Sequence, residues 1–379
     1  MIISKQSELD TLYTTLKDFD YITVDTEFLR DKTYYPKLCL IQVAGPGTEP
    51  VAVDPLVGNL DLSPVFELMA DEKITKVFHA ARQDIEIFYN LTGDVPTSLF
   101  DTQVAAMVCG FGDQIGYNNL VQDVCNQRID KGAQFTDWSR RPLSNKQLSY
   151  ALDDVTYLRD IYTHLVSELG ERTHWVREEM AVLTSPATYQ NLPEESWRRI
   201  KLRTDKPKVL AVLREIAAWR ELEAQRRDVP RNRVIRDETL ADMAVHAPEN
   251  EGDLARIRGF SEDMARGRIG REILEAVRKG LNVPKERCPM VRRKERFPKD
   301  KQPALELVKM LLRVQASRHG VAAKLIATGD DLEALVTGER DIPVLKGWRD
   351  EVFGQSALAL LSGKLSMRLK DGEMVFEGL

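Results

Sequence analysis

Runs of sequence with β-strand character are confined to the first half of this chain, and this division limits the folds that it can adopt. Residues 21–28, 38–44 and 51–54 are short β-rich runs separated by turn-forming proline and glycine, and they predict a strand meander. Further strands are expected at residues 74–79 and in the stretch that ends at Asp101. Helical spacing occurs at 63–70, 81–89, 102–109 and 144–169, the last with Ser144 as the expected N-cap. This order predicts an α/β domain in which helices pack on a mixed sheet.

Helical periodicity replaces the strand patterns after about residue 190. Helices are expected at 208–227, 238–246, 252–257 and 262–279, and again from Ala304 to the end. Between these two blocks, residues 283–303 are rich in proline and charge and have too little apolar content to pack well, which predicts a linker. The sequences IRGF and LKGW, which end at Phe260 and Trp348, each precede an amphipathic stretch. They suggest a repeated helical module, although two unrelated helix starts could produce the same match.

The charge of the chain is divided in the same way as its secondary structure. The net charge of the 379 residues is −5, but residues 1–190 carry 16 Lys and Arg against 28 Asp and Glu, a net of −12. Residues 191–379 carry 38 against 31, a net of +7. An acidic front half can hold cations, and a basic back half can hold a polyanion by releasing its counterions. Ordinary solvated surfaces would explain both charges equally well.

Composition places the chain among globular proteins, with 43% hydrophobic and 30% charged residues. No apolar run approaches the ~18 residues that a membrane span needs, and the N-terminus lacks the features of a signal or transit peptide. The four cysteines are scattered singly, without the spacing of a zinc site or a disulfide framework. We therefore expect a cytoplasmic protein that does not enter a membrane.

Asp25 and Glu27, in the segment VDTEF, are the most informative residues. On a strand, residues i and i+2 point to the same face, so these two carboxylates emerge side by side from a strand that is otherwise expected to be buried. Burying two unpaired carboxylates is costly. Either they lie at a frayed strand end in water, or a doubly positive partner holds them.

Three other polar residues belong to the same half of the chain. Tyr150 and Asp154 are four residues apart on the long helix and therefore share a face. Asp84 comes early in the helix that follows the strand ending at His79. Taken singly, Asp154 is consistent with a solvated helix charge and Asp84 with a first-turn acid favoured by the helix dipole.

Taken together, the order DxE, HxxxxD and YxxxD resembles the signature of the tyrosine-bearing branch of the DEDD exonuclease superfamily. The segments TYYPKLCLIQVA, VFHAARQD and DWSRRPLSNKQLSYALDDVTYL are similar to those of the bacterial ribonuclease D family. The basic helical block, with AAWRELEAQRRDVPRNRVIRDETLADMA and IRGF, resembles the HRDC domain that RecQ helicases and ribonuclease D share. The resemblance covers nearly the whole chain and is weakest after Pro303.

The resemblance implies a domain order and a fold. Residues 1–190 are expected to form a ribonuclease H-like 3′–5′ exonuclease domain, a mixed sheet flanked by helices. Residues 206–285 are expected to form one all-α HRDC domain and residues 303–379 a second, HRDC-like one, with a basic linker at 286–302.

The resemblance also implies a metal-dependent hydrolysis. Two divalent ions, Mg²⁺ or Mn²⁺, suit a site made of carboxylates because these hard cations prefer oxygen ligands. By similarity, Asp25 would bridge both ions, Glu27 and Asp154 would hold the ion that carries the attacking water, and Asp84 would hold the second largely through water. Tyr150 would orient the attacking water. The product would be a nucleoside 5′-monophosphate released stepwise from a 3′ end.

Seven further residues of these segments are candidates for substrate contact. Phe28 could stack on a terminal base, and His79 could contact a phosphate or a ribose, although each could equally be a structural residue. Arg140 and Arg141 could bind the nucleic-acid backbone or could simply be solvated. The remaining candidates are Gln42, Gln83 and Trp138.

The sequence thus predicts a 3′–5′ exoribonuclease that trims structured RNA, with tRNA precursors as the substrate that the resemblance suggests and no obligate protein partner. A DNA exonuclease of the same superfamily is an alternative, because recognition of the 2′-hydroxyl depends on the shape of the pocket. A non-catalytic nucleic-acid-binding protein is a second alternative. It would be expected to lack one of the four acids, and all four are present.

Overall fold

The computed structural model describes residues 1–291 and 296–378, and within these residues the chain forms two compact units. One unit combines residues 1–27 and 39–188 with the C-terminal region, and the other combines residues 28–38 with the helical segment that follows residue 188. The predicted linker, 286–302, includes residues 292–295, which lie outside the described residues.

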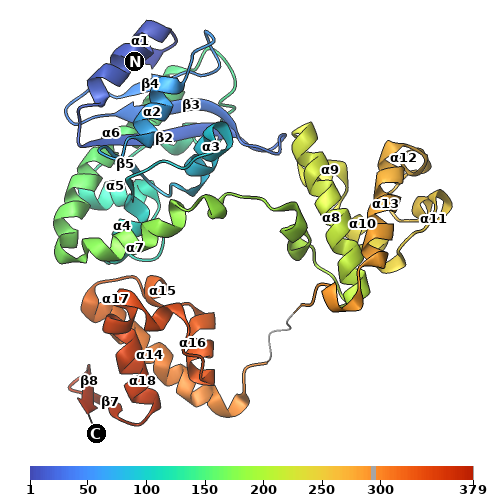
Figure 1. Cartoon of the computed structure of the whole chain (residues 1–379). Coiled ribbons are helices and arrows are strands. Elements are labelled where there is room, and N and C mark those ends of the chain that lie inside the picture. Colours follow the sequence, from blue (N-terminus) through green and yellow to red (C-terminus); the bar gives the residue numbers. More distant parts are fainter. Residues whose placement is uncertain (292–295, 379) are drawn as a thin grey trace. The chain divides into compact units, whose positions relative to one another are not determined.

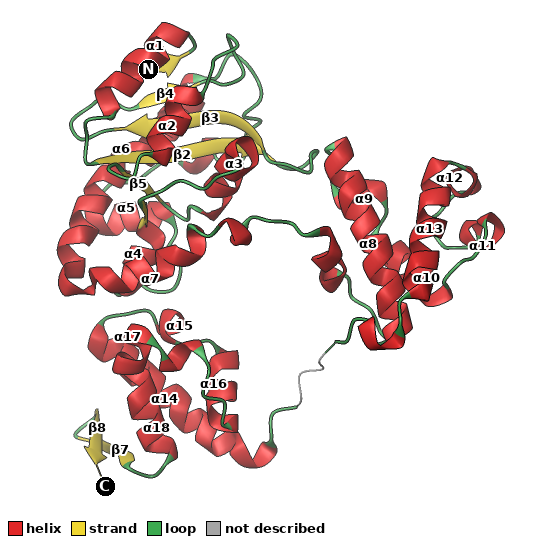
Figure 2. Ribbon diagram, viewed as in Figure 1, coloured by secondary structure: helices red, strands yellow, loops and turns green. Residues whose placement is uncertain are grey.

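A six-stranded sheet, in the order β1-β4-β3-β2-β5-β6, lies among the helices of the N-terminal part of the first unit (Figure 2). The neighbours β1 and β4, β2 and β5, and β5 and β6 are parallel, whereas β3 and β4 are antiparallel, so the predicted mixed sheet is confirmed. The strands are β1 (Ile2–Ile3), β2 (Tyr21–Leu29), β3 (Lys37–Ala44), β4 (Val51–Val53), β5 (Thr75–Phe78) and β6 (Leu99–Asp101).

Helices precede, separate or follow the strands of this sheet in the sequence (Figure 1). They are α1 (Gln6–Leu16), α2 (Ser63–Ala70), α3 (Arg82–Thr92), α4 (Thr102–Val108), α5 (Tyr117–Cys125), α6 (Asn145–Leu169) and α7 (Thr173–Leu183). Of these, α1, α5 and α7 were not expected from the sequence.

The long helix α6 begins where the sequence predicts. The Ser144 side chain accepts a hydrogen bond from the Gln147 backbone N–H, and the Gln147 side-chain oxygen accepts one from the Ser144 backbone N–H, which completes a capping box. One face of α6 buries apolar residues at spacings of three and four, from Ala151 to Leu165, as a helix packed on a core requires. This face also receives a hydrogen bond from the sheet, because the Thr23 hydroxyl of β2 donates to the carbonyl of Val155 at 2.8 Å. The contact fixes α6 beside the strand that carries Asp25.

The C-terminal region of this unit is helical, with α14 (Gln302–His319), α15 (Ala323–Ile326), α16 (Gly329–Thr337), α17 (Gly347–Arg349) and α18 (Gln355–Leu361). Side chains of this region contact α7. The indole rings of Trp175 and Trp348 stack with centroids 4.6 Å apart and planes at 14°, and Arg349 forms an ion pair with Glu179 at 2.5 Å. Gly347 of the LKGW segment has a φ of +52°, a conformation that favours glycine.

The expectation of helix up to the C-terminus is wrong. Residues Leu365–Lys370 and Glu373–Gly378 form an antiparallel hairpin, β7–β8. The turn between the strands is made by Asp371 and Gly372, whose φ values of +50° and +85° are those that a two-residue hairpin turn demands. The Asp-Gly pair, flanked by alternating apolar residues, was a strand signal that the helical interpretation overlooked.

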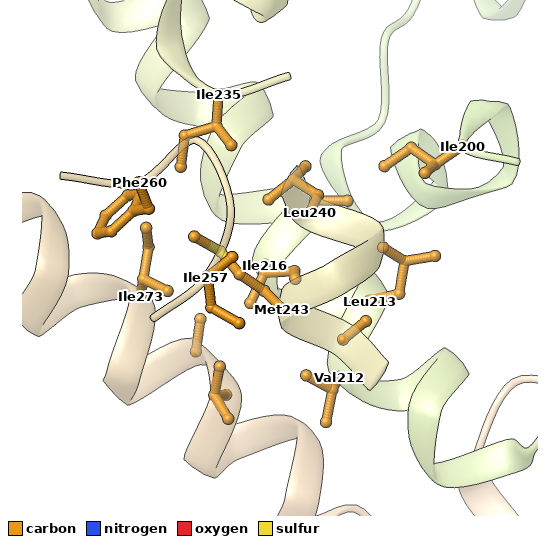
Figure 3. Packing of buried hydrophobic residues seen from close by; sticks show 14 of the residues in the cluster. Ile200, Val212, Leu213, Ile216, Ile235, Leu240, Met243, Ile257, Phe260 and Ile273 are labelled. Carbon is orange, nitrogen blue, oxygen red and sulfur yellow. The ribbon is translucent and has the colours of Figure 1, made fainter. Parts of the chain in front are cut away.

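The second unit is a bundle of α8 (Pro207–Arg227), α9 (Arg231–Val234), α10 (Asp237–His246), α11 (Glu251–Ala255), α12 (Glu262–Arg266) and α13 (Arg268–Asn282). Its core gathers side chains from all parts of this segment, among them Ile216, Met243 and Ile273 (Figure 3). The helix expected at 262–279 is split at Gly267, which adopts an extended conformation. None of the helices in the described part of the chain combines the length and apolar character needed to cross a bilayer.

Tyr34, from the segment that follows β2, belongs to the core of this second unit and is only 8% exposed. Its hydroxyl donates to Glu221 of α8 and accepts hydrogen bonds from Gln225 and Arg231, both at 3.1 Å. The guanidinium of Arg231 also lies over the tyrosine ring, 4.7 Å from its centroid. The segment between β2 and β3 is therefore packed into the helical unit.

Candidate active site

The carboxylates of Asp25, Glu27 and Asp154 converge on one point. One carboxylate oxygen from each lies within 4.8 Å of the others, although Asp154 is far from the other two in the sequence. Asp25 and Glu27 share a face of β2. Asp154 is brought to them because α6 packs beside this strand: the carbonyl of Val155, the residue after Asp154, accepts a hydrogen bond from Thr23 of β2. The packing of one helix against one strand thus assembles the cluster.

Asp84 lies in the first turn of α3, outside this group of three. The hydroxyl of Thr26, between the two β2 acids, donates a hydrogen bond to Asp84 Oδ1 at 2.5 Å. The preceding turn is shaped by Asp101, which accepts hydrogen bonds from the backbone N–H groups of Ala80 and Ala81 at 3.0 and 2.8 Å. Ala80 has a φ of +57°, which these bonds hold in place. Asp84 is therefore presented toward β2 by two flanking polar residues.

The four acids perturb one another. Burial raises the pKa of Asp25 well above its usual range, and the charge of Asp154 raises it further. Burial raises the pKa of Glu27 to about 10, with contributions from Asp25, Asp154 and Asp84. Burial raises the pKa of Asp154 to about 7, and burial together with Asp25 raises that of Asp84. Carboxylates in this arrangement repel one another and favour any bound cation.

The donor set of the cluster suits hard divalent cations. Within residues 1–291 and 296–378, no lysine, arginine or histidine forms an ion pair with any of the four acids, so their charge is not neutralised by the protein. All the available ligand atoms are oxygens, which Mg²⁺ and Mn²⁺ prefer. The residues present therefore fit a divalent metal centre.

Tyr150 lies beside this cluster, one turn before Asp154 on α6. Burial and the neighbouring charges of Asp154, Glu27 and Asp25 raise the pKa of its phenol, and its hydroxyl is hydrogen-bonded to the Asp154 carboxylate. Tyr150 is therefore protonated at neutral pH and acts as a hydrogen-bond donor.

Among the other sequence candidates, His79 is held by two contacts. Its Nε2 faces the carbonyl of Ile115 at 3.1 Å, which can only accept, and its Nδ1 faces the Thr102 hydroxyl at 3.0 Å. Burial lowers the pKa of the imidazole. The geometry thus favours a neutral histidine that ties the strand end of β5 to the loop before α5.

Three further candidates differ in exposure. Gln42 on β3 is fully buried, and neither polar atom of its amide has a hydrogen-bond partner in the structure. Gln83 on α3 is exposed. Phe28, near the end of β2, is half-buried and directly follows the acids.

The remaining candidates precede α6. Trp138 is 2% exposed, and its ring lies 6.2 Å from that of Tyr150 at 36°. Arg140 is exposed and forms a 3.4 Å ion pair with Asp137. Arg141 forms a bidentate ion pair with the buried Asp54, with distances of 2.5 and 2.7 Å. Only Arg140 of these two arginines presents its head group to solvent.

The structure adds residues that sequence reasoning missed. Tyr117, at the start of α5, donates a hydrogen bond from its hydroxyl to the carbonyl of Asp153 at 3.0 Å. Burial raises the pKa of this phenol, and the charges of Asp154 and Asp25 raise it further, which places it near the acidic cluster. Thr26 and Asp101 were missed as well. Thr26 stands inside the DxE motif and could have been noticed there, whereas neither Tyr117 nor Asp101 carries a local signal.

Two protein-family models match parts of this chain. Residues 1–170 match the family model of the 3′–5′ exonuclease, and residues 209–277 match that of the HRDC domain. Ribonuclease D of Nitrobacter hamburgensis is 48% identical over 377 residues, covering 99% of this chain and 98% of that protein. Ribonuclease D of Bartonella henselae is 44% identical over 377 residues, covering 98% and 93%. The crystal structure of Escherichia coli RNase D is 31% identical and superposes with a TM-score of 0.80, covering 96% of this chain and 98% of that one.

Proposed function

Because this chain belongs to the ribonuclease D family and is a 3′–5′ exoribonuclease, we propose that it removes nucleoside 5′-monophosphates one at a time from the 3′ ends of structured RNAs, tRNA precursors in particular. The Escherichia coli enzyme is described as an exoribonuclease involved in structured RNA processing, and it is similar to this chain over nearly its whole length. The observation that carries the proposal is the convergence of Asp25, Glu27 and Asp154 beside Tyr150.

The matching exonuclease family is of the two-metal-ion type, and we propose Mg²⁺ or Mn²⁺ as the ions. Asp25 would contact both, Glu27 and Asp154 would hold the first, and Asp84 would hold the second largely through water. Divalent cations bound there would supply a water of lowered pKa and would neutralise the charge that develops on the phosphate and the leaving oxygen.

The side chains of the site would supply position and hydrogen bonds. Since the Tyr150 phenol stays protonated, it would orient the attacking water rather than accept its proton. Thr26 would keep Asp84 turned toward β2 through its 2.5 Å hydrogen bond. Phe28, directly after the acids on β2, would be available to stack on the terminal base.

We propose that the remaining substrate candidates play unequal parts. Arg140 and Gln83 are exposed and would meet the RNA backbone. The other four candidates are buried or already hydrogen-bonded to protein groups, and they would hold the site in shape without touching the RNA: His79, Gln42, Trp138 and Arg141.

We further propose that residues 1–190 cleave the RNA and that the HRDC domain at 206–285 and the helical region at 303–379 bind its body. Residues 206–302 carry 24 Lys and Arg against 17 Asp and Glu, a net of +7, which supports this division because lysines and arginines that neutralise phosphates release counterions. Residues 303–379 carry 10 against 11 and add no net positive charge. No disulfide joins the four cysteines, which is consistent with a reducing compartment, and we propose the cytoplasm.

The test compares the parent enzyme with Asp25→Asn, which keeps the shape of the side chain and removes its charge. Each is incubated with a 3′-extended tRNA and with a single-stranded DNA of equal length, in Mg²⁺, in Mn²⁺ and in a chelator, and the products are separated by chromatography. We expect mononucleotides from the RNA, only with a divalent ion and only from the parent. Asp153→Asn, which lies next to Asp154 on α6 but outside the cluster, is the matched control and should remain active.

Three outcomes would contradict parts of this proposal. Retention of more than a few per cent of the parent rate by Asp25→Asn would make the metal assignment wrong. Equal rates on RNA and DNA would make the substrate assignment wrong. Oligonucleotide fragments in place of mononucleotides would contradict stepwise cleavage.

A further inference from the structure

The guanidinium of Arg141 uses every one of its five N–H donors. Its Nε donates to Asp54 Oδ2 at 2.5 Å, and one terminal nitrogen, Nη2, donates both to Asp54 Oδ1 and to the carbonyl of Cys39, each at 2.7 Å. The two remaining hydrogens reach the carbonyls of Trp138 at 2.7 Å and Arg140 at 2.9 Å. An arginine has no sixth donor, so none is left for an RNA phosphate.

These bonds connect two parts of the domain that are distant in sequence. Asp54 follows β4 and Cys39 lies in β3, whereas the carbonyls of Trp138 and Arg140 belong to the segment that leads into α6. The side chain of Asp54 is 4% exposed and that of Arg141 20%. A bidentate pair fixes the relative orientation of its two groups, and removing one partner of a buried pair is costly. Arg141 therefore holds the backbone of this segment against the sheet.

Trp138 depends on that backbone for its place. Its indole N–H is buried and has no hydrogen-bond partner, so no polar contact of the ring itself fixes its orientation. Trp138 is held instead by the hydrogen bond from Arg141 to its backbone carbonyl and by the packing around its side chain, since the residue is 2% exposed. The ring of Trp138 faces Tyr150: the two ring centroids are 6.2 Å apart, and the ring planes are inclined at 36°.

A second route links the same segment to α6. The Gln147 amide of the capping box donates to the Thr136 hydroxyl at 3.1 Å, and Thr136 in turn donates to the carbonyl of Ala133 at 2.7 Å. The start of α6 is thus hydrogen-bonded to the residues just before Trp138. Tyr150 lies in the second turn of that helix.

We propose that Arg141, together with Asp54, is a positioning residue for Tyr150. Arg141 anchors the Trp138 backbone, Trp138 supports the Tyr150 ring, and the phenol is thereby held in the orientation in which its hydroxyl meets Asp154 and the attacking water. The proposal rests on the function proposed above for Tyr150. It assigns to Arg141 a role through the protein rather than contact with substrate.

The test is a double-mutant cycle between Arg141→Lys and Tyr150→Phe in the full chain. Lysine keeps the positive charge but has three N–H donors in place of five and no planar fork, so it cannot make all five of the bonds that Arg141 forms with Asp54, Cys39, Trp138 and Arg140. With a short RNA and saturating Mg²⁺, Arg141→Lys should lower kcat by about 10- to 100-fold, the loss expected when a catalytic group is displaced by a fraction of an ångström to an ångström. KM and the Mg²⁺ concentration for half-maximal activity should stay within about twofold of the parent, because substrate and metal ligands are untouched.

In the Tyr150→Phe background the same Arg141→Lys change should lower kcat by less than about threefold, because the hydroxyl that Arg141 positions is already gone. Arg159→Lys is the matched control. Arg159 is also on α6 and donates to the carbonyls of Gly45 and Thr48 at 3.2 and 2.7 Å. It lies more than two turns beyond Tyr150, and its replacement should change kcat little and by the same factor in both backgrounds.

Trp138→Leu provides a second route to the same conclusion if Arg141→Lys is poorly folded by circular dichroism. It should lower kcat in the parent and have little further effect in Tyr150→Phe, whereas Trp138→Phe, which keeps a ring, should restore most of the activity. A loss that is the same in both backgrounds, for either residue, would overturn the proposal while leaving the role of Tyr150 intact. If Tyr150→Phe itself retained full kcat, the proposed role of Tyr150 would fail and the positioning role with it.

Discussion

Replacing Glu27 by glutamine should stabilise the metal-free enzyme, and the gain should increase with pH. Burial and the neighbouring acids raise the pKa of Glu27 from 4.5 to about 10. Between these two values the unfolded chain releases a proton that the folded chain keeps, so folding becomes less favourable as the pH rises. Below the unfolded pKa both states are protonated and the penalty disappears. Glutamine has no proton to lose and removes the penalty.

The size of the effect follows from the same pKa values. Each pH unit above 4.5 costs the folded state about 1.4 kcal/mol. At about pH 7.5 the gap of three units corresponds to roughly 4 kcal/mol, and at about pH 5 to less than 1 kcal/mol. A buried glutamine amide also loses hydrogen bonds to water, so we expect a net gain of about 2–3 kcal/mol at the higher pH. For a folding unit of this size that raises Tm by roughly 5–10 °C.

The assay is differential scanning calorimetry of the full chain at both pH values, in a chelator and in Mg²⁺. The transition that responds to Mg²⁺ reports on the nuclease unit. Mg²⁺ should stabilise the parent more than Glu27→Gln, so the advantage of the variant should be smaller in Mg²⁺ than in the chelator. Glu49→Gln, an exposed glutamate of the same domain, is the control and should change neither transition. A Glu27→Gln gain that is absent, or equal at both pH values, would refute the reasoning.

Three other changes test separate parts of the molecule. Tyr150→Phe should lower kcat by roughly 10²- to 10⁴-fold without changing the Mg²⁺ concentration for half-maximal activity; full rescue at high Mg²⁺ would mean that Tyr150 acts through metal binding. Tyr34→Phe removes the hydroxyl that donates to Glu221 and accepts from Arg231, so the helical unit should lose about 1–2 kcal/mol of stability in the same calorimeter; an unchanged transition would mean that this network contributes nothing. Replacing the exposed Arg256, Arg258 and Arg266 together by glutamine should weaken tRNA binding and reduce the slope of log K against log[salt] by up to about 3; an unchanged slope would remove this surface from the RNA interface.

Local patterns of the sequence were enough to predict the elements that carry the acidic cluster. The period of two along residues 21–28 predicted that Asp25 and Glu27 share a face, and the structure has them on one strand, β2. The Ser144 cap and the apolar spacing after it predicted α6. Such features depend on dihedral angles and hydrogen bonds among residues a few positions apart, which the chain specifies wherever it lies in the fold. The same local rules, applied fully, would also have revealed the hairpin at Asp371 and Gly372.

Only the tertiary structure decided which side chains meet. Asp154 approaches the β2 acids because α6 packs on the sheet, and Asp84 turns toward them through a bond to Thr26. Arg141 reads in the sequence as one of two adjacent cations, yet it is enclosed by Asp54 and three carbonyls while Arg140 remains in solvent. Contacts of this kind join residues dozens of positions apart, and their free energy depends on burial and on the surrounding dielectric. Burial and the local dielectric are set only when the chain has folded, so a local pattern in the sequence cannot predict these contacts.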